Sequence, residues 1–163
     1  MIGASSGRWI PGTVVAICLV LIHHAMATER NVEIRLAVAV SGIGTFIDSV
    51  QTTLGLLVFH VGQPIDWLAP FWMIVLWILF AITLRYALWW LNNRPLAATA
   101  LGVFGGPLAF YAGHQVGAVD FHPTTGLSLC VLAIVWGFLI PSLLWLSRQI
   151  TGNDLPGGYR FIT

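Results

Sequence analysis

The chain has 163 residues, of which 58% are hydrophobic and only 8% are charged, and its formal net charge at pH 7 is +1. A soluble domain carries about 25% charged residues, so this composition excludes an ordinary soluble globular protein. The small net charge also argues against a nucleic-acid partner, because nucleic-acid-binding domains usually present a strongly basic face. Cys18 and Cys130 both fall inside apolar runs, which favours two thiols buried in lipid over a disulfide framework.

The first apolar stretch has two interpretations. Residues 14–22 (VVAICLVLI), followed by Ala25-Met26-Ala27, resemble a secretory signal with a small-residue cleavage site. The leader carries only Arg8 as a side-chain cation, which is weak for a signal sequence. We therefore expect this stretch to be the first membrane span.

Apolar stretches long enough to cross a bilayer recur along the whole chain, since a spanning helix needs about 20 apolar residues. We expect spans at 10–27, 36–61, 68–91, 96–117 and 127–148, in one transmembrane domain (residues 1–163) that ends in a polar tail at 149–163. Pro95 is placed to begin the fourth span, because a proline is tolerated in the first turn of a helix. The sequence thus predicts an all-α fold, a polytopic transmembrane bundle of about five spans.

Five crossings place the two termini on opposite sides of the membrane, and the distribution of arginine predicts which side is which. One side receives only Arg8, and the other receives Arg30, Arg35, Arg94, Arg148 and Arg160. Because cytoplasmic loops carry the excess of basic residues, we predict an external N-terminus and a cytoplasmic C-terminus.

The second predicted span carries an acidic residue, Asp48, close to its middle. At about 1.5 Å rise per residue, Asp48 would lie near the midplane of the bilayer. An unpaired carboxylate there costs at least about 2.5–3.5 kcal/mol on insertion scales, so intramembrane acids usually face a partner inside the bundle.

Arg85 in the third predicted span is the best candidate for that partner. Counted from the outer ends of their spans, Asp48 would lie at roughly 19 Å and Arg85 at roughly 25 Å, a gap that an arginine side chain can bridge. Alternatively, Arg85 extends to the cytoplasmic headgroups beside Trp89 and Trp90. An unpaired Asp48 would then be protonated, because desolvation disfavours the charged carboxylate.

Small and hydroxylated residues form a stripe along the same span. They recur every four residues, as Ser41, Thr45, Ser49 and Thr53, with a parallel row of Gly44, Asp48 and Thr52. A spacing of four places residues on one helix face. This pattern favours a seam where a neighbouring helix packs closely, and a polar pathway is the alternative.

The fourth predicted span is interrupted at Gly105, Gly106 and Pro107. Pro107 removes one helical hydrogen bond at about the depth of Asp48, where irregular backbone is tolerated only under protein or water. The sequence therefore predicts a kinked bundle with a polar centre, and a binding cavity is the alternative. The residues expected at this intramembrane centre are Asp48, Arg85, Thr52, Gly106, Pro107, Tyr111 and His114.

Histidines and acids also gather in the loops of the predicted outer face. Three imidazoles and two carboxylates could in principle bind zinc or iron, but their spacing matches no known metal motif. We expect no metal and no cofactor. The weak candidates for a metal site are His60, His114, His122 and Asp120.

Three stretches carry a resemblance to a known family. Residues 46–49 (FIDS), 70–81 (PFWMIVLWILFA) and 105–113 (GGPLAFYAG) resemble domain-of-unknown-function family 2878, and the similarity covers nearly the whole chain. The resemblance implies a multi-pass protein of the bacterial inner (cytoplasmic) membrane and a role linked to lipids. It supplies no catalytic residues.

Three functions are compatible with these features. The first is an accessory or structural inner-membrane protein, linked to lipid modification, without catalysis of its own. The second is a small membrane-embedded enzyme that acts on lipid, with Asp48, Arg85, Tyr111 and His114 in its pocket. The third is a proton-coupled transporter that uses Asp48, although such folds usually have repeated halves. The expected partners are membrane lipids, a second copy of the chain or other membrane proteins.

Overall fold

The computed structural model describes residues 9–27, 29–60 and 62–152. The predicted tail beyond Gly152, with Arg160, and the leader residue Arg8 lie outside the described residues. The helices are α1 (Trp9–Met26), α2 (Arg30–Thr53), α3 (Phe71–Tyr86), a short 3-10 helix η1 (Trp89–Asn93), α4 (Pro95–Gln115) and α5 (Thr125–Thr151). Two three-residue strands, β1 (Leu57–Phe59) and β2 (Val119–Phe121), form one antiparallel pair. The all-α prediction is confirmed.

The second helix does not lie where the sequence predicted it. The prediction was 36–61, whereas α2 begins six residues earlier and ends eight residues earlier, at Thr53. Gly55 has φ +69°, a left-handed conformation that glycine adopts easily, and the chain then enters β1. Asp48 is therefore five residues from the end of its helix rather than at the middle.

The third predicted span is also divided. α3 ends at Tyr86, and residues 89–91 of the predicted span lie in the separate 3-10 helix η1. The other helices agree more closely with the predicted stretches. α4 begins with Pro95 in its first turn, as expected, and α5 is capped by the Thr124 hydroxyl, which accepts a hydrogen bond from the Leu127 N–H.

Two helices within the described residues, α4 and α5, are both long and apolar enough to cross a membrane by length and composition. α1 and α3 are apolar but shorter. α2 has the length, but its sequence holds Arg30, Glu33, Arg35 and Asp48. These findings are compatible with a membrane protein.

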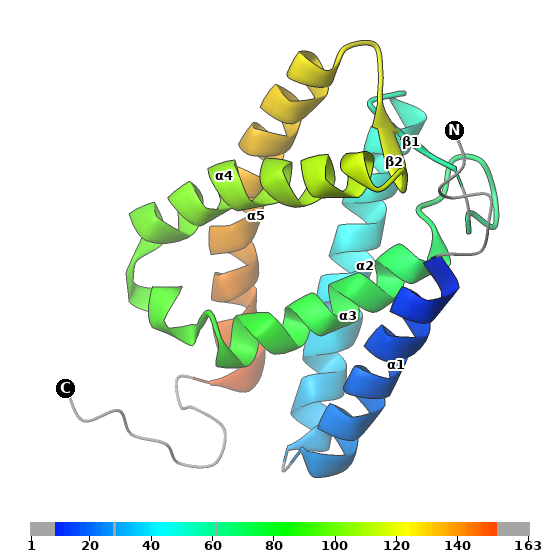
Figure 1. Cartoon of the computed structure of the whole chain (residues 1–163). Coiled ribbons are helices and arrows are strands. Elements are labelled where there is room, and N and C mark those ends of the chain that lie inside the picture. The colour runs from blue at the N-terminus through cyan, green and yellow to red at the C-terminus, as the bar shows by residue number, and fades with distance from the viewer. Residues whose placement is uncertain (1–8, 28, 61, 153–163) are drawn as a thin grey trace.

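The helices form two groups that meet along α2, α3 and α5. α1 and α2 are joined at one end and each packs against α3, and α4 runs across α5 in the view of Figure 1. The close approach of α4 to α5 depends on glycine: a Cβ atom at Gly102 would lie 2.0 Å from the Trp136 carbonyl oxygen. Any larger residue at this crossing would force the two helices apart.

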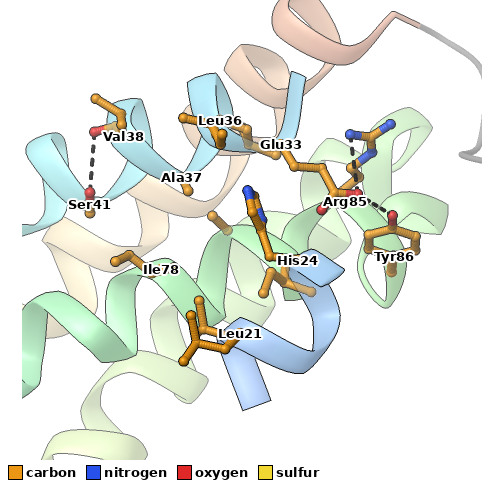
Figure 2. A pocket seen from close by; sticks show the side chains of 14 residues that line it. Leu21, His24, Glu33, Leu36, Ala37, Val38, Ser41, Ile78, Arg85 and Tyr86 are labelled. Atoms are coloured by element: carbon orange, nitrogen blue, oxygen red, sulfur yellow. Dashed lines mark hydrogen bonds and ion pairs between the residues drawn. The ribbon is translucent and has the colours of Figure 1, made fainter. Parts of the chain in front are cut away.

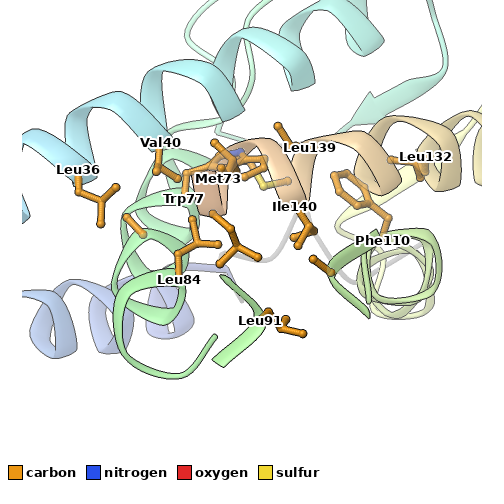
Figure 3. Packing of buried hydrophobic residues seen from close by; sticks show 14 of the residues in the cluster. Leu36, Val40, Met73, Trp77, Leu84, Leu91, Phe110, Leu132, Leu139 and Ile140 are labelled. Carbon is orange, nitrogen blue, oxygen red and sulfur yellow. The ribbon is translucent and has the colours of Figure 1, made fainter. Parts of the chain in front are cut away.

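The core connects all the helices after α1 through aliphatic and aromatic side chains. Leu36 and Val40 of α2, Leu84 of α3 and Leu132 of α5 are each no more than 1% exposed (Figure 3). The opposite faces carry exposed apolar side chains, including Leu21 (62%), Phe104 (68%) and Phe138 (74%). The molecule thus has an apolar inside and an apolar outside.

Two stacked tryptophans occupy the centre. The indole rings of Trp77 and Trp136 are 5.2 Å apart and inclined by only 12°. Glycine backs each ring: a Cβ atom at Gly44 would lie 2.0 Å from Trp77, and one at Gly106 would lie 2.2 Å from Trp136. The stack therefore joins α2, α3, α5 and α4 in one continuous contact.

Candidate functional site

A cluster of charged and polar side chains lies where the ends of α1, α2 and α3 meet. Glu33 in the first turn of α2 is only 6% exposed, and its Oε2 lies 2.9 Å from His23 Nε2. The Tyr86 hydroxyl donates to Glu33 Oε1, and Arg85 Nη1 lies 3.7 Å from the same oxygen. Arg85 Nη2 donates to Glu29, completing a network that links three helices.

The arrangement satisfies a buried carboxylate. Three groups from two neighbouring helices converge on Glu33, and one of them carries a positive charge. A buried charge is tolerated when it is paired and hydrogen-bonded. The cluster therefore fixes the ends of α1 and α3 against α2.

An apolar cleft of about 200 Å³ leads away from this cluster, between α1, α2 and α3. Its walls are mostly aliphatic, and Glu33, Arg85, Tyr86 and His24 stand at one end (Figure 2). Its other lining residues are Val20, Leu21, Ile34, Leu36, Ala37, Val38, Ser41, Ile78, Ala81 and Ile82. The cleft is amphipathic in its layout: a long apolar wall ends at a charged group.

The polar end of the cleft has unused hydrogen-bond donors. Arg85 is 2% exposed, and its Nε and Nη1 atoms have no hydrogen-bond partner. His24 extends from α1 toward α2 (Figure 2) and makes no hydrogen bond or ion pair with any described residue. The acceptor oxygens beside them are occupied, since both Glu33 oxygens already hold donors.

Asp48 lies elsewhere, in the contact between α2 and α3. It is fully buried, and its Oδ2 accepts a hydrogen bond of 2.7 Å from Trp77 Nε1, while Oδ1 has no partner. Trp77 and Arg85 are eight residues apart on α3, which places them about 12 Å apart along the helix. The expected contact between Asp48 and Arg85 is therefore not formed, and Arg85 pairs with Glu29 and Glu33 instead.

The hydroxyl groups of the polar stripe on α2 form hydrogen bonds within α2 itself. The Thr52 hydroxyl donates to the Asp48 carbonyl at 2.8 Å, and the Ser49 hydroxyl donates to the Thr45 carbonyl at 2.6 Å. These bonds return to α2 itself. The close approach predicted for this face occurs at Gly44, where the Trp77 ring packs directly on the helix.

The residues predicted to form one polar centre lie in four separate places. Arg85 belongs to the charged cluster, and Asp48 and Thr52 lie near the Trp77 ring. Gly106 packs under Trp136, and Pro107 follows it inside α4. Tyr111 is 43% exposed, with its ring centroid 6.3 Å from that of His114 near the end of α4.

The predicted outer group of histidines does assemble in part. Asp120 in β2 is shared by two imidazoles: His60 Nε2 lies 2.9 Å from Oδ2, and His114 Nδ1 lies 3.0 Å from Oδ1. The His122 backbone N–H donates to the Leu56 carbonyl, beside β1. Across the ranges that the structure describes, no group of three or more His, Cys, Asp or Glu residues is arranged to hold a metal ion.

Comparison with protein families identifies the family of this chain. The model of a family described as a protein of unknown function, DUF2878, matches residues 1–142. The chain belongs to this family. The match confirms the resemblance seen in the sequence, and the family's description names no ligand and no reaction. No curated protein and no solved structure was found to match the chain.

Sequence reasoning missed most of the charged cluster in this DUF2878 member. Glu29 and Glu33 fall between the predicted spans 10–27 and 36–61, and His23 and His24, at the end of the first predicted span, were not among the candidate site residues. A usable signal existed: Glu29 and Glu33 are four residues apart, which places them on one helix face. The predicted topology also put them on the same side of the membrane as the end of the span that holds Arg85.

Proposed function

We propose that this protein is a multi-pass protein of the bacterial inner membrane that holds an acyl chain of a lipid in the cleft between α1, α2 and α3. In this proposal it crosses the membrane five times, with an external N-terminus and a cytoplasmic C-terminus. Its role is accessory: it binds or presents lipid in connection with lipid modification and performs no catalysis itself.

The outer surface supports a membrane location. Exposed apolar side chains of this size and number on α1, α4 and α5 would be unfavourable in water, whereas hydrocarbon is their natural surrounding. The distance between the polar regions agrees. Glu33 and Thr53 are 20 residues apart on α2, or about 30 Å, which is the thickness of the hydrocarbon core.

The main support for lipid binding is the cleft itself. A volume of about 200 Å³ exceeds the roughly 150 Å³ of an engineered apolar cavity that binds benzene. Its walls are aliphatic rather than aromatic over most of their length, which suits a flexible hydrocarbon chain. A charged group at one end of an otherwise apolar wall matches the layout of a lipid, with a polar head on an apolar tail.

The accessory role rests on how the polar groups are used. Glu33, the most buried acid at the cleft, is occupied on both oxygens by His23 and Tyr86. A general base must be free to accept a proton from a substrate within hydrogen-bond reach. Because each Glu33 oxygen already has a hydrogen-bond partner, binding is favoured over catalysis at this site.

Filling the cleft tests the proposal. Ala37→Phe places a ring in the cleft, and Ala100→Phe, at an exposed position on α4, is the matched control. The proteins are purified in mild detergent, and the lipid that co-purifies with each is measured by native mass spectrometry. We expect Ala37→Phe to lose most of the bound lipid and Ala100→Phe to keep it. Equal retention by both variants would refute the cleft as the binding site.

Mapping the two termini tests the crossings separately. Accessible tags at the N-terminus and the C-terminus should respond to a membrane-impermeant reagent from opposite sides. Two tags in one compartment would contradict five crossings, whatever the outcome at the cleft.

A further inference from the structure

The polar residues at the end of the cleft indicate which class of lipid head group it would accept. We propose that this end recognises the phosphate of an anionic phospholipid, with His24 in direct contact and Arg85 supplying positive charge from behind. This inference rests on the proposed function, because it names the class of lipid that the cleft takes. It depends on three observations: the unused donors, the local charge and the shape of the cleft.

Donors at this end lack hydrogen bonds. Arg85 Nε and Nη1 make no hydrogen bond, although Nη1 lies 3.7 Å from Glu33 Oε1 in an ion pair, and His24 makes none with any described residue. Each carboxylate oxygen of the neighbouring Glu33 already has a hydrogen-bond partner, His23 or Tyr86. A ligand group with several acceptor oxygens complements the donors that lack hydrogen bonds.

The end of the molecule that holds the cleft has a small positive formal charge. The ends of α1, α2 and α3 contain three arginines and two glutamates, so their formal charge is 3 − 2 = +1 with the histidines neutral. Those residues are Glu29, Arg30, Glu33, Arg35 and Arg85, of which Glu33 and Arg85 line the cleft itself. Guanidinium groups bind phosphate oxygens well because their N–H donors match the geometry of the anion.

The position of His24 makes it the contact residue. Its side chain is partly exposed within the cleft, between the aliphatic wall and the charged cluster (Figure 2). Arg85 is almost completely buried and reaches the same end from α3. A phosphate that enters with its acyl chain along the aliphatic wall would meet the imidazole first, and the guanidinium would stabilise its charge.

The test compares two lipids with identical acyl chains. The full-length protein in mild detergent is titrated with phosphatidylglycerol and with diacylglycerol, which lacks the phosphate, and apparent Kd values are obtained by native mass spectrometry. A hydrogen bond to a charged group corresponds to a change in affinity of about tenfold or more. We expect phosphatidylglycerol to bind at least about tenfold more tightly than diacylglycerol.

Variants separate the head group from the chain. His24→Leu should weaken phosphatidylglycerol about tenfold and leave diacylglycerol unchanged, while His122→Leu, an exposed histidine near the β strands, should change neither. Arg85→Lys keeps the charge and serves as a second variant, with folding checked by its unfolding temperature. It should retain part of the preference that Arg85→Gln loses.

The outcomes distinguish the two proposals. If both lipids bind equally and Ala37→Phe weakens both, the cleft binds lipid but does not recognise phosphate, and the present inference is overturned. An unchanged phosphatidylglycerol preference in both His24→Leu and Arg85→Gln would overturn it too. If Ala37→Phe weakens neither lipid, the proposed function itself fails.

Discussion

Two buried acids on the same helix are treated in opposite ways. Glu33 and Asp48 are 15 residues apart on α2, about 22 Å, and both are almost inaccessible, at 6% and 0% exposure. Glu33 has donors on both oxygens and a guanidinium 3.7 Å away. Asp48 has one donor, the Trp77 indole, and no cation within ion-pair distance among the described residues.

The difference shows what each acid does for the fold. Glu33 joins α1, α2 and α3 through charge and hydrogen bonds at one end of the molecule, beside the cleft. Asp48 orients the Trp77 side chain, whose ring is held between Gly44 and Trp136. Packing is therefore the main stabilising interaction at the centre. We therefore expect the charged end to be sensitive to the loss of charge and the centre to be sensitive to volume.

The largest effect is expected at the charged end. Glu33→Ala leaves the buried Arg85 with only the half-exposed Glu29, and breaking a buried ion pair in this way costs about 3–5 kcal/mol. Unfolding of the purified protein in detergent, followed by tryptophan fluorescence, measures it. Glu29→Ala is the matched control: Glu29 is 48% exposed, and a surface pair contributes about 0–1 kcal/mol. Equal losses in the two variants would contradict the central place given to Glu33.

The centre should respond to one added methyl group. Gly44→Ala places a Cβ atom 2.0 Å from the Trp77 ring, and overpacking of this kind typically costs about 1–3 kcal/mol. Gly42→Ala, two residues away, meets nothing within 4 Å. It should raise stability by up to about 1 kcal/mol because alanine favours the helix. The same unfolding assay measures both, and destabilisation by both would indicate that α2 tolerates no substitution there.

The sequence predicted the helices well and their boundaries less well. Apolar runs separated by polar turns located all five long helices, and Pro95 marked the start of α4. The end of α2 was missed because residues 54–61 remain apolar, and a short apolar run does not distinguish a helix from a strand. The decisive features were the left-handed Gly55 and a pairing partner, β2, more than sixty residues away in the chain.

The candidate site was predicted even less completely, for a physical reason. Depth counting brought Asp48 and Arg85 to similar levels, but depth does not specify which helix faces meet. The acids that Arg85 contacts lie just before and within the first turn of α2. The predicted span began after both, which placed them in a loop. An error of six residues in one boundary thus removed the partner from consideration.

Replacing Asp48 tests the second of the two buried acids. Asp48→Asn keeps the shape and retains an oxygen that can accept from Trp77 Nε1, so we expect a loss of about 1 kcal/mol or less. Asp48→Leu leaves the indole N–H unsatisfied and should cost about 1–3 kcal/mol. Lipid retention should be unchanged in Asp48→Asn because Asp48 does not line the cleft. A loss of bound lipid at full stability would instead favour an active role for Asp48.

The smallest effect is expected at the far end, where Asp120 joins β2 to His60 of the neighbouring segment and to His114 of α4. Asp120 is 48% exposed, and an exposed pair contributes only about 0.2–1 kcal/mol. Asp120→Asn should therefore leave global unfolding almost unchanged. It should increase hydrogen exchange at the amide of Val58 in β1, which pairs with Asp120, since local opening needs less free energy than unfolding. His122→Asn provides the control at an exposed neighbour. A global loss comparable to that of Glu33→Ala would show that this end, too, is held by charge.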